Sequence, residues 1–592
     1  MKFPYGTSDF YKIATQGYYY ADRTQYIRLM EEMGDYLLFL RPRRFGKSLW
    51  LNTLKNYYDV ARKDDFEQLF GNLAISKNPT QTRNSYFILT FDFSCVEIER
   101  TPKEVRASLF EHINAVIEGF NKDYAAFLPE KAEISDNALR SFKNLLSVVR
   151  QTQHKLYLMI DEYDSFANAV LISYGRQNYE NLVRADGLLR YVFREIKSAT
   201  SGLGVDRVFA TGVTPVVMSD VTSGANIFDN ISLDRACSEL CGLTESEVEK
   251  ALKTIIKECG LADSFVKGAL ALMQTYYQGY YFHQRQVEKI FNPTLCLYFF
   301  KKFKRECEYP EEMLDANLAP DADNLRYIKG LPGGEKLLWE LSQGKRITTT
   351  KLINKFGLKD MFNQKRMDLT FLTSFLWYSG IISIAGKNKK GSLIFDVPNL
   401  VIHGLFIDEA KDILLTDSLA RNDALNASAK LYEDGEIEPV VKFVEQRIYP
   451  VFSNRDYIRA DELSVKAIFL AILFEDRFFI MESERERRKG YPDLAMIVRP
   501  DCRQNGILDV IIEFKYISLS EMKITGEQIR KMTDHALCAT DKVKEKLEQG
   551  KKQAVRYAQD LKNEIQFVSD DFAPAKWVVV SVGFERIVWK KV

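Results

Sequence analysis

Two groups of residues in this 592-residue sequence have the types and the spacing needed for chemistry on phosphates. The first is the segment RPRRFGKS at 41–48, in which Lys47 and Ser48 follow a glycine. The apolar run 36–40 before it predicts a buried strand, and the apolar spacing after it predicts a helix from Leu49. Backbone N–H groups between a strand and a helix can hold phosphate. The segment therefore predicts a nucleoside triphosphate site.

Each residue of this loop has an expected role. Lys47 neutralises the β and γ phosphates, and the Ser48 hydroxyl binds Mg²⁺. A GKS sequence alone is also typical of a helix that Ser48 merely caps. Arg41 stands where the usual pattern has its first glycine. The other residues expected at the nucleotide are Arg43, Arg44, Phe45 and Gly46, and the two arginines contact either phosphate or a neighbouring domain.

A strand that ends in carboxylates supports the nucleotide site. The run LYLMIDEYD at 156–164 predicts a buried strand with Asp161 and Glu162 at its carboxyl end, where ligands bind in parallel sheets. We expect Asp161 to hold Mg²⁺ through water and Glu162 to polarise the attacking water, rather than to cap a helix. A strand at 207–213 carries Thr211, whose hydroxyl either contacts the γ phosphate or is satisfied within a turn.

The second group lies near the C-terminus, on strands predicted at 493–498 and 509–514. Asp493 begins the first strand, while Glu513 and Lys515 alternate on the second and so share a face. Two carboxylates can hold Mg²⁺ or Mn²⁺, which polarises a phosphodiester, and a lysine beside them can orient water. The pattern predicts a site that hydrolyses phosphodiesters.

The first 300 or so residues resemble the AAA-ATPase-like domain of large prokaryotic proteins. The resemblance rests on six ordered segments at 17–27, 41–49, 158–164, 209–215, 241–248 and 276–297. It implies that ATP is bound and hydrolysed, it tolerates an arginine at position 41, and it places the segment around Asp22 and Thr24 near the nucleotide.

The C-terminal group resembles the PD-(D/E)XK nuclease superfamily, whose RecB-like members have a helical QxxxY signature. The matching residues are Pro492-Asp493, Glu513-x-Lys515 and Gln553-xxx-Tyr557. The resemblance implies a restriction-endonuclease-like fold and catalytic roles for Asp493, Glu513, Lys515, Gln553 and Tyr557. It also implies a helical acid before the first strand. Glu462, at the start of a helix predicted over 461–475, is our choice, and Glu475 is its competitor.

Two lysine-rich segments could contact a nucleic-acid backbone. The 37 residues between Lys515 and Gln553 suggest an inserted helical segment, which equally fits a solvated amphipathic helix. Its lysines are Lys542, Lys544, Lys546, Lys551 and Lys552. Earlier, helices predicted at 336–343, 349–356 and 368–379 and strands at 381–384 and 393–397 are the parts of a winged helix. Lys387, Lys389 and Lys390 lie on its turn, where a solvated hairpin tip is the favoured interpretation.

The composition bears on which partners, location and cysteine chemistry to expect. Lys plus Arg (82) and Asp plus Glu (81) nearly cancel, so any nucleic-acid site must be a local patch. Since no apolar run approaches the roughly 20 residues that span a bilayer, and the start lacks a signal peptide, we expect a cytoplasmic protein with no membrane partner. The eight cysteines include no CxxC pair, which predicts neither disulfides nor zinc.

Together these observations predict an α/β multidomain protein. We expect a P-loop AAA-like ATPase core with a parallel sheet over 1–240, a helical lid over 241–315, a linker and winged-helix-like module over 316–400, a helical connector over 401–435, and a PD-(D/E)XK nuclease-like domain over 436–592. The best candidate for the linker itself is the Pro- and Gly-containing stretch 316–335.

The favoured hypothesis is an ATP- and Mg²⁺-binding ATPase coupled to a metal-dependent nuclease, with DNA favoured over RNA as its substrate. ATP would alter access to the nuclease site or its assembly. The alternative is an ATP-dependent signalling switch of the STAND or AAA-like kind, whose nuclease-like domain only binds nucleic acid or protein. A helicase-like motor is weaker, because no further helicase motifs occur and one P-loop domain would have to act as a homo-oligomer.

Overall fold

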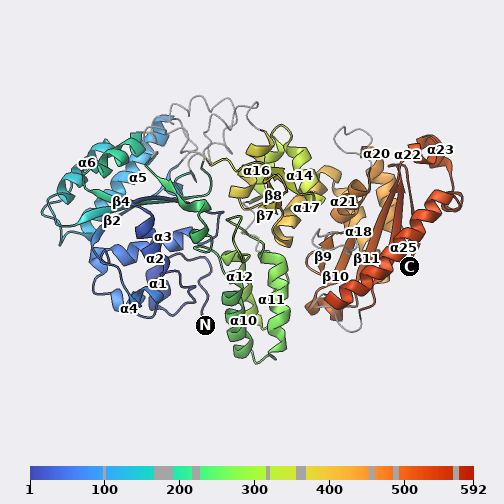
Figure 1. Ribbon diagram of the computed structural model, residues 1–592, viewed down its shortest axis with the longest axis horizontal. Helices are drawn as coiled ribbons and strands as arrows, with labels where there is room; N and C mark the ends of the chain where they lie inside the picture. Colours follow the sequence, from blue (N-terminus) through green and yellow to red (C-terminus); the bar gives the residue numbers. More distant parts are fainter. Residues whose placement is uncertain are drawn as a thin grey trace. The chain divides into compact units, whose positions relative to one another are not determined.

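The computed structural model describes residues 1–97, 102–165, 191–215, 227–314, 321–354, 368–415, 417–452, 461–483, 493–564 and 572–592 (Figure 1). The chain divides into two compact units, and each consists of three segments. Unit 1 comprises Met1–Ala251, Gly279–Lys301 and Thr348–Phe395, and unit 2 comprises Leu252–Gln278, Lys302–Ile347 and Asp396–Val592. Among the described residues, no helix combines the length and the apolar character that crossing a membrane requires.

The core of unit 1 is a five-stranded parallel sheet. Its strands are β1 (Tyr36–Leu40), β2 (Tyr86–Asp92), β3 (Lys155–Asp161), β4 (Val205–Gly212) and β5 (Asp229–Asn230), in the order β2-β3-β4-β1-β5. β1 and β3 are buried along almost their whole length, which is why both read as apolar runs. The predicted parallel α/β sheet is confirmed, and it is consistent with a P-loop NTPase fold.

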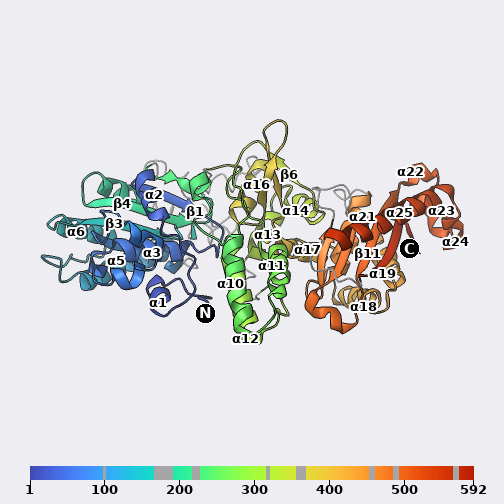
Figure 2. The same ribbon diagram turned by 60° about the horizontal axis from the view of Figure 1, so that its bottom comes forward.

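Helices pack on this sheet. α3 (Lys47–Tyr58) begins directly after the loop that follows β1, and it packs against β2, β3 and β4. α5 (Pro102–Asp123) and α6 (Ala138–Val149) lie side by side, with α5 against β2 (Figures 1 and 2). The N-terminal part adds three short helices: α1 (Phe10–Thr15), α2 (Tyr26–Met33) and α4 (Phe66–Phe70).

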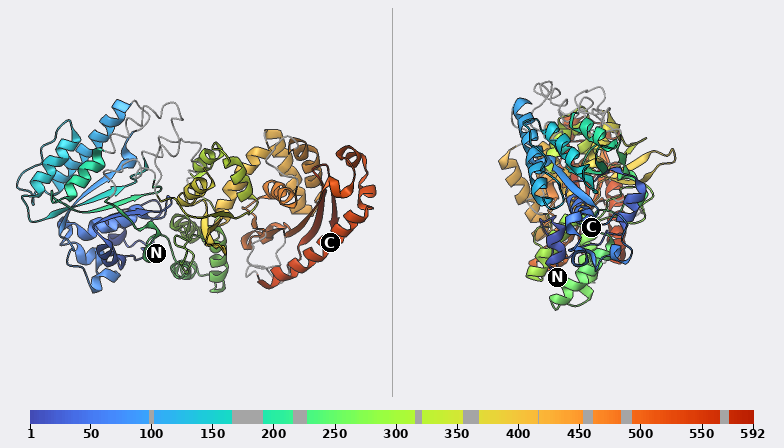
Figure 3. Two further views of the ribbon diagram at one scale, coloured as in Figure 1. Left: turned by 45° about the horizontal axis from the view of Figure 1, so that its top comes forward. Right: turned by 90° about the vertical axis from the view of Figure 1, so that its left-hand side faces the viewer.

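Unit 2 contains a five-stranded mixed sheet. Its strands are β9 (Phe479–Ser483), β10 (Leu494–Val498), β11 (Val510–Ile517), β12 (Ala575–Val582) and β13 (Arg586–Lys591), in the order β13-β12-β11-β10-β9. β11 and β12 are parallel, and the other neighbouring strands are antiparallel. α21 (Glu462–Leu473) packs against β11, and the long helix α25 (Asp541–Glu564) packs along β11 and β12 (Figures 1 and 3).

The segment between Lys515 and Gln553 is largely helical, as predicted from its length. It contains α22 (Leu519–Met522), α23 (Gly526–Lys531), α24 (Asp534–Cys538) and the first half of α25. The three short helices lie together beside the start of α25 (Figure 2). Ile529 and Leu537 are fully buried against the strands β12 and β13, so this segment is part of the folded unit.

The middle of the chain contains the three-stranded sheet β6-β8-β7, formed by β6 (Ile347–Thr349), β7 (Ser383–Lys387) and β8 (Leu393–Asp396). The helix predicted over 349–356 was wrong at its start. The β-branched residues Ile347–Thr349 form a strand, and residues 350–354 are not helical. Residues 355–356 lie outside the described ranges. The helices here are α14 (Gly334–Ser342) and α16 (Leu369–Tyr378), close to their predicted ranges.

Two further expectations about this region need correction. The predicted linker 316–335 contains a helix, α13 (Asp321–Lys329), because Leu325 and Ile328 are fully buried. The expectation of no disulfides was also wrong. Cys259 and Cys307 are 48 residues apart in sequence, but they follow the helices α10 (Glu245–Glu258) and α12 (Pro293–Glu306), and they form a disulfide with a Cα–Cα distance of 5.6 Å.

The remaining helices of unit 2 are α11 (Ser264–Tyr277), α17 (Leu400–Leu414), α18 (Ser418–Asp434), α19 (Glu438–Phe443) and α20 (Tyr449–Phe452). α17 and α18 pack against α21, and α11 packs against α17. The helix that carries Glu462 is therefore packed against α17 and α18.

Candidate nucleotide and phosphodiester sites

The loop between β1 and α3 folds around the ammonium group of Lys47. Gly46 has φ +90°, in the left-handed region that favours glycine, and it directly precedes the first residue of α3. Lys47 Nζ donates hydrogen bonds to the carbonyl oxygens of Arg41 and Pro42, each at 3.0 Å. The loop thus presents its backbone and the start of a helix on the side where the sequence predicts phosphate.

Lys47 is almost completely buried. Burial lowers the pKa of its ammonium group, and the nearby carboxylates of Asp164, Asp161 and Glu162 act in the opposite direction. The ammonium is therefore a cation held inside the protein by carbonyl oxygens and by a cluster of acids. Phosphate oxygens are negatively charged, so they accept stronger hydrogen bonds from the Lys47 ammonium than neutral carbonyl oxygens do. A bound phosphate can therefore take the place of the two carbonyl oxygens.

Arg41 has a role within the fold. Its guanidinium carbon lies 4.4 Å from the ring centre of Phe39 and 4.2 Å from that of Phe282. It donates hydrogen bonds to the carbonyl oxygens of Ser232 (2.7 Å) and Cys237 (2.8 Å). Burial lowers its pKa to about 10. Arg41 therefore bonds the start of the loop to the segment after β5, and its guanidinium packs between two aromatic rings.

The other loop residues lie close to this site. Phe45 is buried edge-on against Tyr280 and Phe282. Arg44 has φ +66°, and its carbonyl oxygen accepts a hydrogen bond from the Thr294 hydroxyl. Arg43 and Ser48 are half-buried. Burial raises the pKa of Glu162, and the charge of Arg43 counteracts this in part, which places Arg43 near the acids.

The acids lie at the carboxyl edge of the parallel sheet. β4 lies between β1, which leads to the loop, and β3, which ends at Asp161, and Thr211 is near the end of β4. The Thr211 hydroxyl is buried and donates a hydrogen bond to the Asp161 carboxylate. The strand order therefore brings Lys47, Thr211, Asp161 and Glu162 to one edge.

The second group of residues comes together on the sheet of unit 2. Leu494 pairs with Ile512 across β10 and β11, so Asp493 lies opposite Glu513. Lys515 Nζ is 2.9 Å from Glu513 Oε1 and 3.9 Å from Asp493 Oδ2. It is also 3.7 Å from Oε1 of Glu462, the first residue of α21. Three carboxylates thus surround one buried ammonium group. Pro492 lies outside the described residues.

Comparison with known proteins identifies the N-terminal part. Residues 4–222 match the family model described as "Predicted AAA-ATPase". This part of the chain is similar to the AAA-ATPase-like family. The match supports ATP binding and hydrolysis by the N-terminal part. Because it ends before unit 2, it gives no information about Asp493, Glu513 and Lys515.

Two other matches are more distant. An uncharacterised protein encoded in the vnfD 5′ region of Azotobacter chroococcum is 28% identical over 249 residues, and the match covers 42% of this chain and 44% of that protein. The chain thus aligns with less than half the length of this relative. The Aeropyrum pernix ORC1 protein, solved in complex with DNA, aligns over 66% of this chain and 94% of its own at 12% identity. Its TM-score of 0.24 does not establish a shared fold.

Glu162, within the matched residues 4–222, has an unusual backbone. Its φ is +47°, which costs a non-glycine residue about 1 kcal/mol or more. The strained turn begins with the Glu162 N–H, which donates to Asp161 Oδ1 at 3.0 Å. Burial raises the pKa of Glu162, and the charge of Lys47 partly counteracts this. The carboxylate is therefore held half-buried, close enough to Lys47 to feel its charge.

Asp164 is a residue of the site to which the sequence analysis gave no role. It is buried, and its carboxylate accepts hydrogen bonds from Val213 N (3.0 Å), Thr214 N (2.7 Å) and the Thr214 hydroxyl (2.8 Å). Asp164 therefore fixes the turn that follows β4 and, with it, the position of Thr211. The signal in the sequence was a third acid after the strand, in DEYD, but its partners lie 50 residues away.

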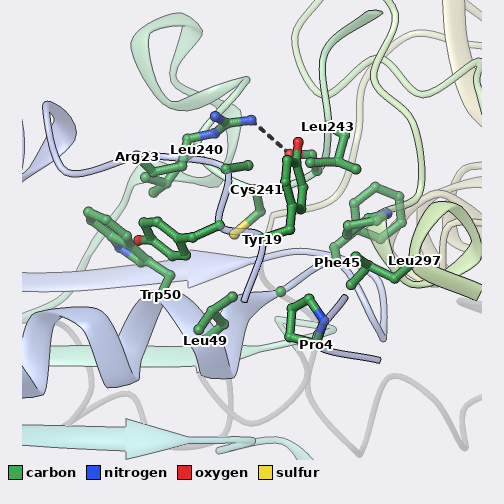
Figure 4. Close-up of a pocket in the computed structure, with 15 residues that line it drawn as sticks. Pro4, Tyr19, Arg23, Phe45, Leu49, Trp50, Leu240, Cys241, Leu243 and Leu297 are labelled. Carbon is green, nitrogen blue, oxygen red and sulfur yellow. Dashed lines mark hydrogen bonds between the residues drawn. The ribbon is translucent and has the colours of Figure 1, made fainter. Parts of the chain in front are cut away.

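A pocket opens beside the loop within unit 1 (Figure 4). Its cavity volume is about 80 Å³, and its lining is mostly apolar. Its lining includes Tyr19, Phe45, Trp50, Leu243 and Leu297. The position next to Gly46 and the flat aromatic walls suit the base of a nucleotide whose phosphates lie at Lys47.

Arg23 closes one side of this pocket. Its guanidinium donates to the Gly242 carbonyl oxygen at 2.9 Å (Figure 4) and forms an ion pair with Glu247, in the first turn of α10. The neighbouring Asp22 carboxylate accepts hydrogen bonds from the Thr24 N–H (2.8 Å) and hydroxyl (2.7 Å). Asp22 and Thr24 therefore shape the chain at the pocket through bonds to each other.

The acids of unit 2 differ in their environments. Glu513 is only 2% exposed, and burial together with the Asp493 charge raises its pKa to about 7, although Lys515 counteracts this. Asp493 Oδ2 accepts a hydrogen bond from Phe514 N at 2.9 Å. Glu513 Oε2 is buried, and within the part of the chain that the structure describes it accepts no hydrogen bond. This oxygen is available to a ligand.

The remaining predicted residues of the nuclease-like site differ in how close they lie to Lys515. Glu462 is beside Lys515, whereas its competitor Glu475 pairs with Arg477 (2.8 Å) after the far end of α21. Gln553 and Tyr557 lie on α25, which packs against the strand that carries Glu513 and Lys515. Tyr557 is buried, and Gln553 Oε1 has no hydrogen-bond partner among the described residues.

Replacing Glu513 by glutamine is expected to stabilise the metal-free protein at pH 8 and to change its stability little near pH 4.5. The folded protein keeps the Glu513 proton up to about pH 7, whereas the unfolded chain loses it near pH 4.5. Folding stability therefore falls as pH rises through this window, and the variant avoids a loss on the order of 3 kcal/mol. The check is the melting temperature between pH 4.5 and pH 8 in the presence of EDTA.

The exposed Glu548 of α25 provides the matched control for this measurement. Glu548→Gln changes the same side chain in the same unit, and it is expected to show no gain that grows with pH. A difference between Glu513→Gln and wild type that stays constant across pH would contradict the burial of a titrating carboxylate at this site.

Proposed function

We propose that this chain couples ATP hydrolysis in its AAA-ATPase-like domain to metal-dependent cleavage of nucleic acid, with DNA as the favoured substrate. The cleavage site belongs to the nuclease-like domain that we assign to residues 436–592. The observation that carries the proposal is the cluster of Asp493, Glu513 and Glu462 within 4 Å of Lys515 Nζ, in which a buried carboxylate oxygen has no partner among the described residues.

In the nucleotide site, each side chain at the carboxyl edge of the parallel sheet has a proposed role. Lys47 exchanges its carbonyl partners for the β and γ phosphates, and Ser48 and Asp161 hold Mg²⁺. Glu162 polarises the attacking water, and Thr211 holds Asp161 in place. The aromatic pocket beside Gly46 accepts the base. These roles follow the strand order, which brings the residues to one edge.

The C-terminal cluster fits a hard divalent cation. Among the described residues, no set of three or more His, Cys, Asp or Glu side chains has a metal-binding arrangement. Two carboxylates with water and a phosphate oxygen are nevertheless a common ligand set for Mg²⁺. Asp493 and the free Oε2 of Glu513 would hold the ion, which polarises the phosphodiester.

The other residues of the cluster act on water and on the substrate. Lys515 donates to Glu513 Oε1 (2.9 Å) and to the Phe514 carbonyl oxygen (2.7 Å), which fixes its ammonium beside both acids. From there it can orient a water molecule or neutralise the charge that develops on the phosphate. Glu462 is half-buried and can accept a proton from that water, while Gln553 and Tyr557 support the site from α25.

The experiment that tests this function uses the full chain with single- and double-stranded DNA and RNA. We expect cleavage of DNA with Mg²⁺ or Mn²⁺, none with EDTA, and a rate that changes when ATP is added. Nucleotide alone, without a divalent ion, is the control. The absence of cleavage with every substrate, metal and nucleotide would instead favour an ATP-dependent signalling switch whose nuclease-like domain only binds nucleic acid or protein.

A further inference from the structure

Lys546 stands apart from the other lysines in the first half of α25. Its side chain is half-buried, whereas the side chains of Lys542, Lys544, Lys551 and Lys552 are exposed. Among the described residues, the Lys546 ammonium has no hydrogen-bond or ion-pair partner. Partial burial takes water away from a charged group, so an anion that approaches this ammonium is bound favourably.

The helix α25 touches the sheet of unit 2 at the level of Glu513. Gly550 makes this possible, because a Cβ atom at its position would lie 2.5 Å from Cγ1 of Val578. Val578 is the residue of β12 that pairs with Glu513 on β11. Since glycine has no side chain to hold the helix away, α25 lies directly on the strand beside Glu513.

The preceding turn of α25 lies at the level of Lys515. Leu547 is buried in one cluster with Val580, the residue of β12 that pairs with Lys515. Lys546 belongs to the same turn as Leu547. Lys546 and Gln553 are seven residues apart, which is about 20° around the helix axis, so they lie on one side of α25 and two turns apart.

The electrostatics of Glu462 show that this side of α25 faces the acids. Burial raises the pKa of Glu462, the charge of Lys515 counteracts this, and the charge of Lys546 does so more weakly. Lys515 Nζ is 3.7 Å from Glu462 Oε1, whereas Lys546 forms no ion pair with a described residue. Lys546 is therefore near the three acids of the site, but it lies further from them than Lys515.

The neighbouring lysine on this side of the helix has a structural role. Lys542, one turn before Lys546, donates a hydrogen bond to the Glu521 carbonyl oxygen at 2.5 Å and so joins α25 to α22. Hydrogen bonds from Ser518 lower the pKa of Glu521, and the charges of Lys542 and Lys546 add to this. Because Glu521 is exposed, solvent screens its attraction for Lys546.

A nucleic-acid strand that enters the site requires positive charge beside the acids. Three carboxylates and the single ammonium of Lys515 leave the cluster negative until a divalent cation binds, and a negative cluster repels phosphates. A strand also carries a charged phosphate on each side of the one that is cut. Lys515 already donates to Glu513 Oε1 and to the Phe514 carbonyl oxygen. Lys546 is the lysine placed to neutralise a neighbouring phosphate.

We infer that Lys546 binds the phosphate next to the one that is cut, so that the site recognises a nucleic-acid strand and not an isolated phosphodiester. The inference rests on the proposed function and names the part of the substrate that the site recognises. Lys546 is a substrate-binding residue in this scheme, and the bond is broken at Asp493 and Glu513.

The affinity of the full chain for a labelled single-stranded oligodeoxynucleotide tests this contact. Fluorescence anisotropy measures it, with Ca²⁺ in place of Mg²⁺. Lys546→Ala is expected to weaken binding about tenfold, the lower end for a hydrogen bond to a charged group. The slope of log affinity against log salt concentration should fall by about 0.7, the contribution of one phosphate contact on a single strand. Lys546→Arg keeps the charge and is expected to retain the affinity and the slope.

Lys430→Ala is the matched control. Lys430 is an exposed lysine of α18 in the same unit, and its ammonium pairs with the Asp434 carboxylate at 3.0 Å. The control removes the same charge from another helix. It is expected to keep the affinity and the salt slope of wild type, and thermal melting compares the folding of all the variants.

Two substrates separate the neighbouring phosphate from the phosphate that is cut. Bis(p-nitrophenyl) phosphate has a single phosphate, so Lys546→Ala is expected to hydrolyse it at the wild-type rate with Mg²⁺ or Mn²⁺. In an oligodeoxynucleotide, a neutral methylphosphonate in place of one neighbouring phosphate is expected to raise KM about tenfold in wild type and to add nothing in Lys546→Ala. The wild-type measurement decides the question if Lys546→Ala does not fold.

The outcomes distinguish the inference from the proposed function. No cleavage of DNA or of the small diester by wild type would refute the proposed function, and the inference would fall with it. Cleavage of DNA by wild type with unchanged affinity and salt slope in Lys546→Ala would overturn the inference alone. An equal loss on the small diester would also overturn it, because Lys546 would then act on the phosphate that is cut. So would a tenfold loss of affinity in Lys430→Ala.

Discussion

Replacing Lys47 by alanine is expected to weaken binding of Mg²⁺ and ATP about 10- to 100-fold, the range for a lost hydrogen bond to a charged group. The ammonium is buried inside the loop, where it already donates two hydrogen bonds, so a phosphate that enters finds the cation in place. Isothermal titration of the full chain with a non-hydrolysable ATP analogue measures the change.

Two further variants make this prediction specific. Lys55→Ala removes an exposed lysine from the same helix, α3, and is expected to bind like wild type. Glu162→Gln keeps the size of the side chain and removes its charge, so binding should persist while turnover falls about 100-fold or more. Equal affinity of Lys47→Ala and wild type would refute the phosphate-binding loop.

Replacing Asp493 by asparagine is expected to reduce DNA cleavage about 1,000-fold, since a metal ligand contributes several kcal/mol and each 1.4 kcal/mol is a factor of ten. Asparagine can still accept the hydrogen bond from Phe514 N, so the fold around β10 is retained. The ATPase rate without DNA should be unchanged. Cleavage rates under saturating Mg²⁺ or Mn²⁺, together with ATP turnover, measure both effects.

The control for this variant is Asp534→Asn, at an exposed carboxylate of unit 2 that pairs with Arg586. It is expected to cleave like wild type. If Asp493→Asn retained the wild-type rate, the cluster at Lys515 would not be the site of cleavage, whatever nuclease activity the protein possesses.

The strands that carry the candidate residues were predictable from the sequence. β1 and β3 are buried on both faces, so their apolar runs appear in the sequence without any knowledge of their neighbours. On β11, the alternation of Glu513 and Lys515 was enough to place both side chains on one face. In the structure, Lys515 Nζ lies 2.9 Å from Glu513 Oε1. Local periodicity determines such features.

Features that depend on distant partners were not predictable in this way. In the sequence, Arg41 replaces the first glycine of the usual phosphate-loop pattern. In the structure it is buried against Phe282, some 240 residues further along the chain. The disulfide between Cys259 and Cys307 depends on how α10 and α12 end beside each other. The place of β4 between β1 and β3, which positions Thr211, is likewise a property of the assembled sheet.

Because the two units are interleaved along the chain, their synthesis has a fixed order. The chain passes from one unit to the other at five places, and the last segment of unit 1 ends at Phe395. A ribosome adds about 5–20 residues per second, so unit 1 stays incomplete until Phe395 has been added. During that time the residues of α11, which belong to unit 2, have emerged without the strands that later cover Tyr276. Nascent chains that stop before Phe479 should therefore be ready substrates for chaperones.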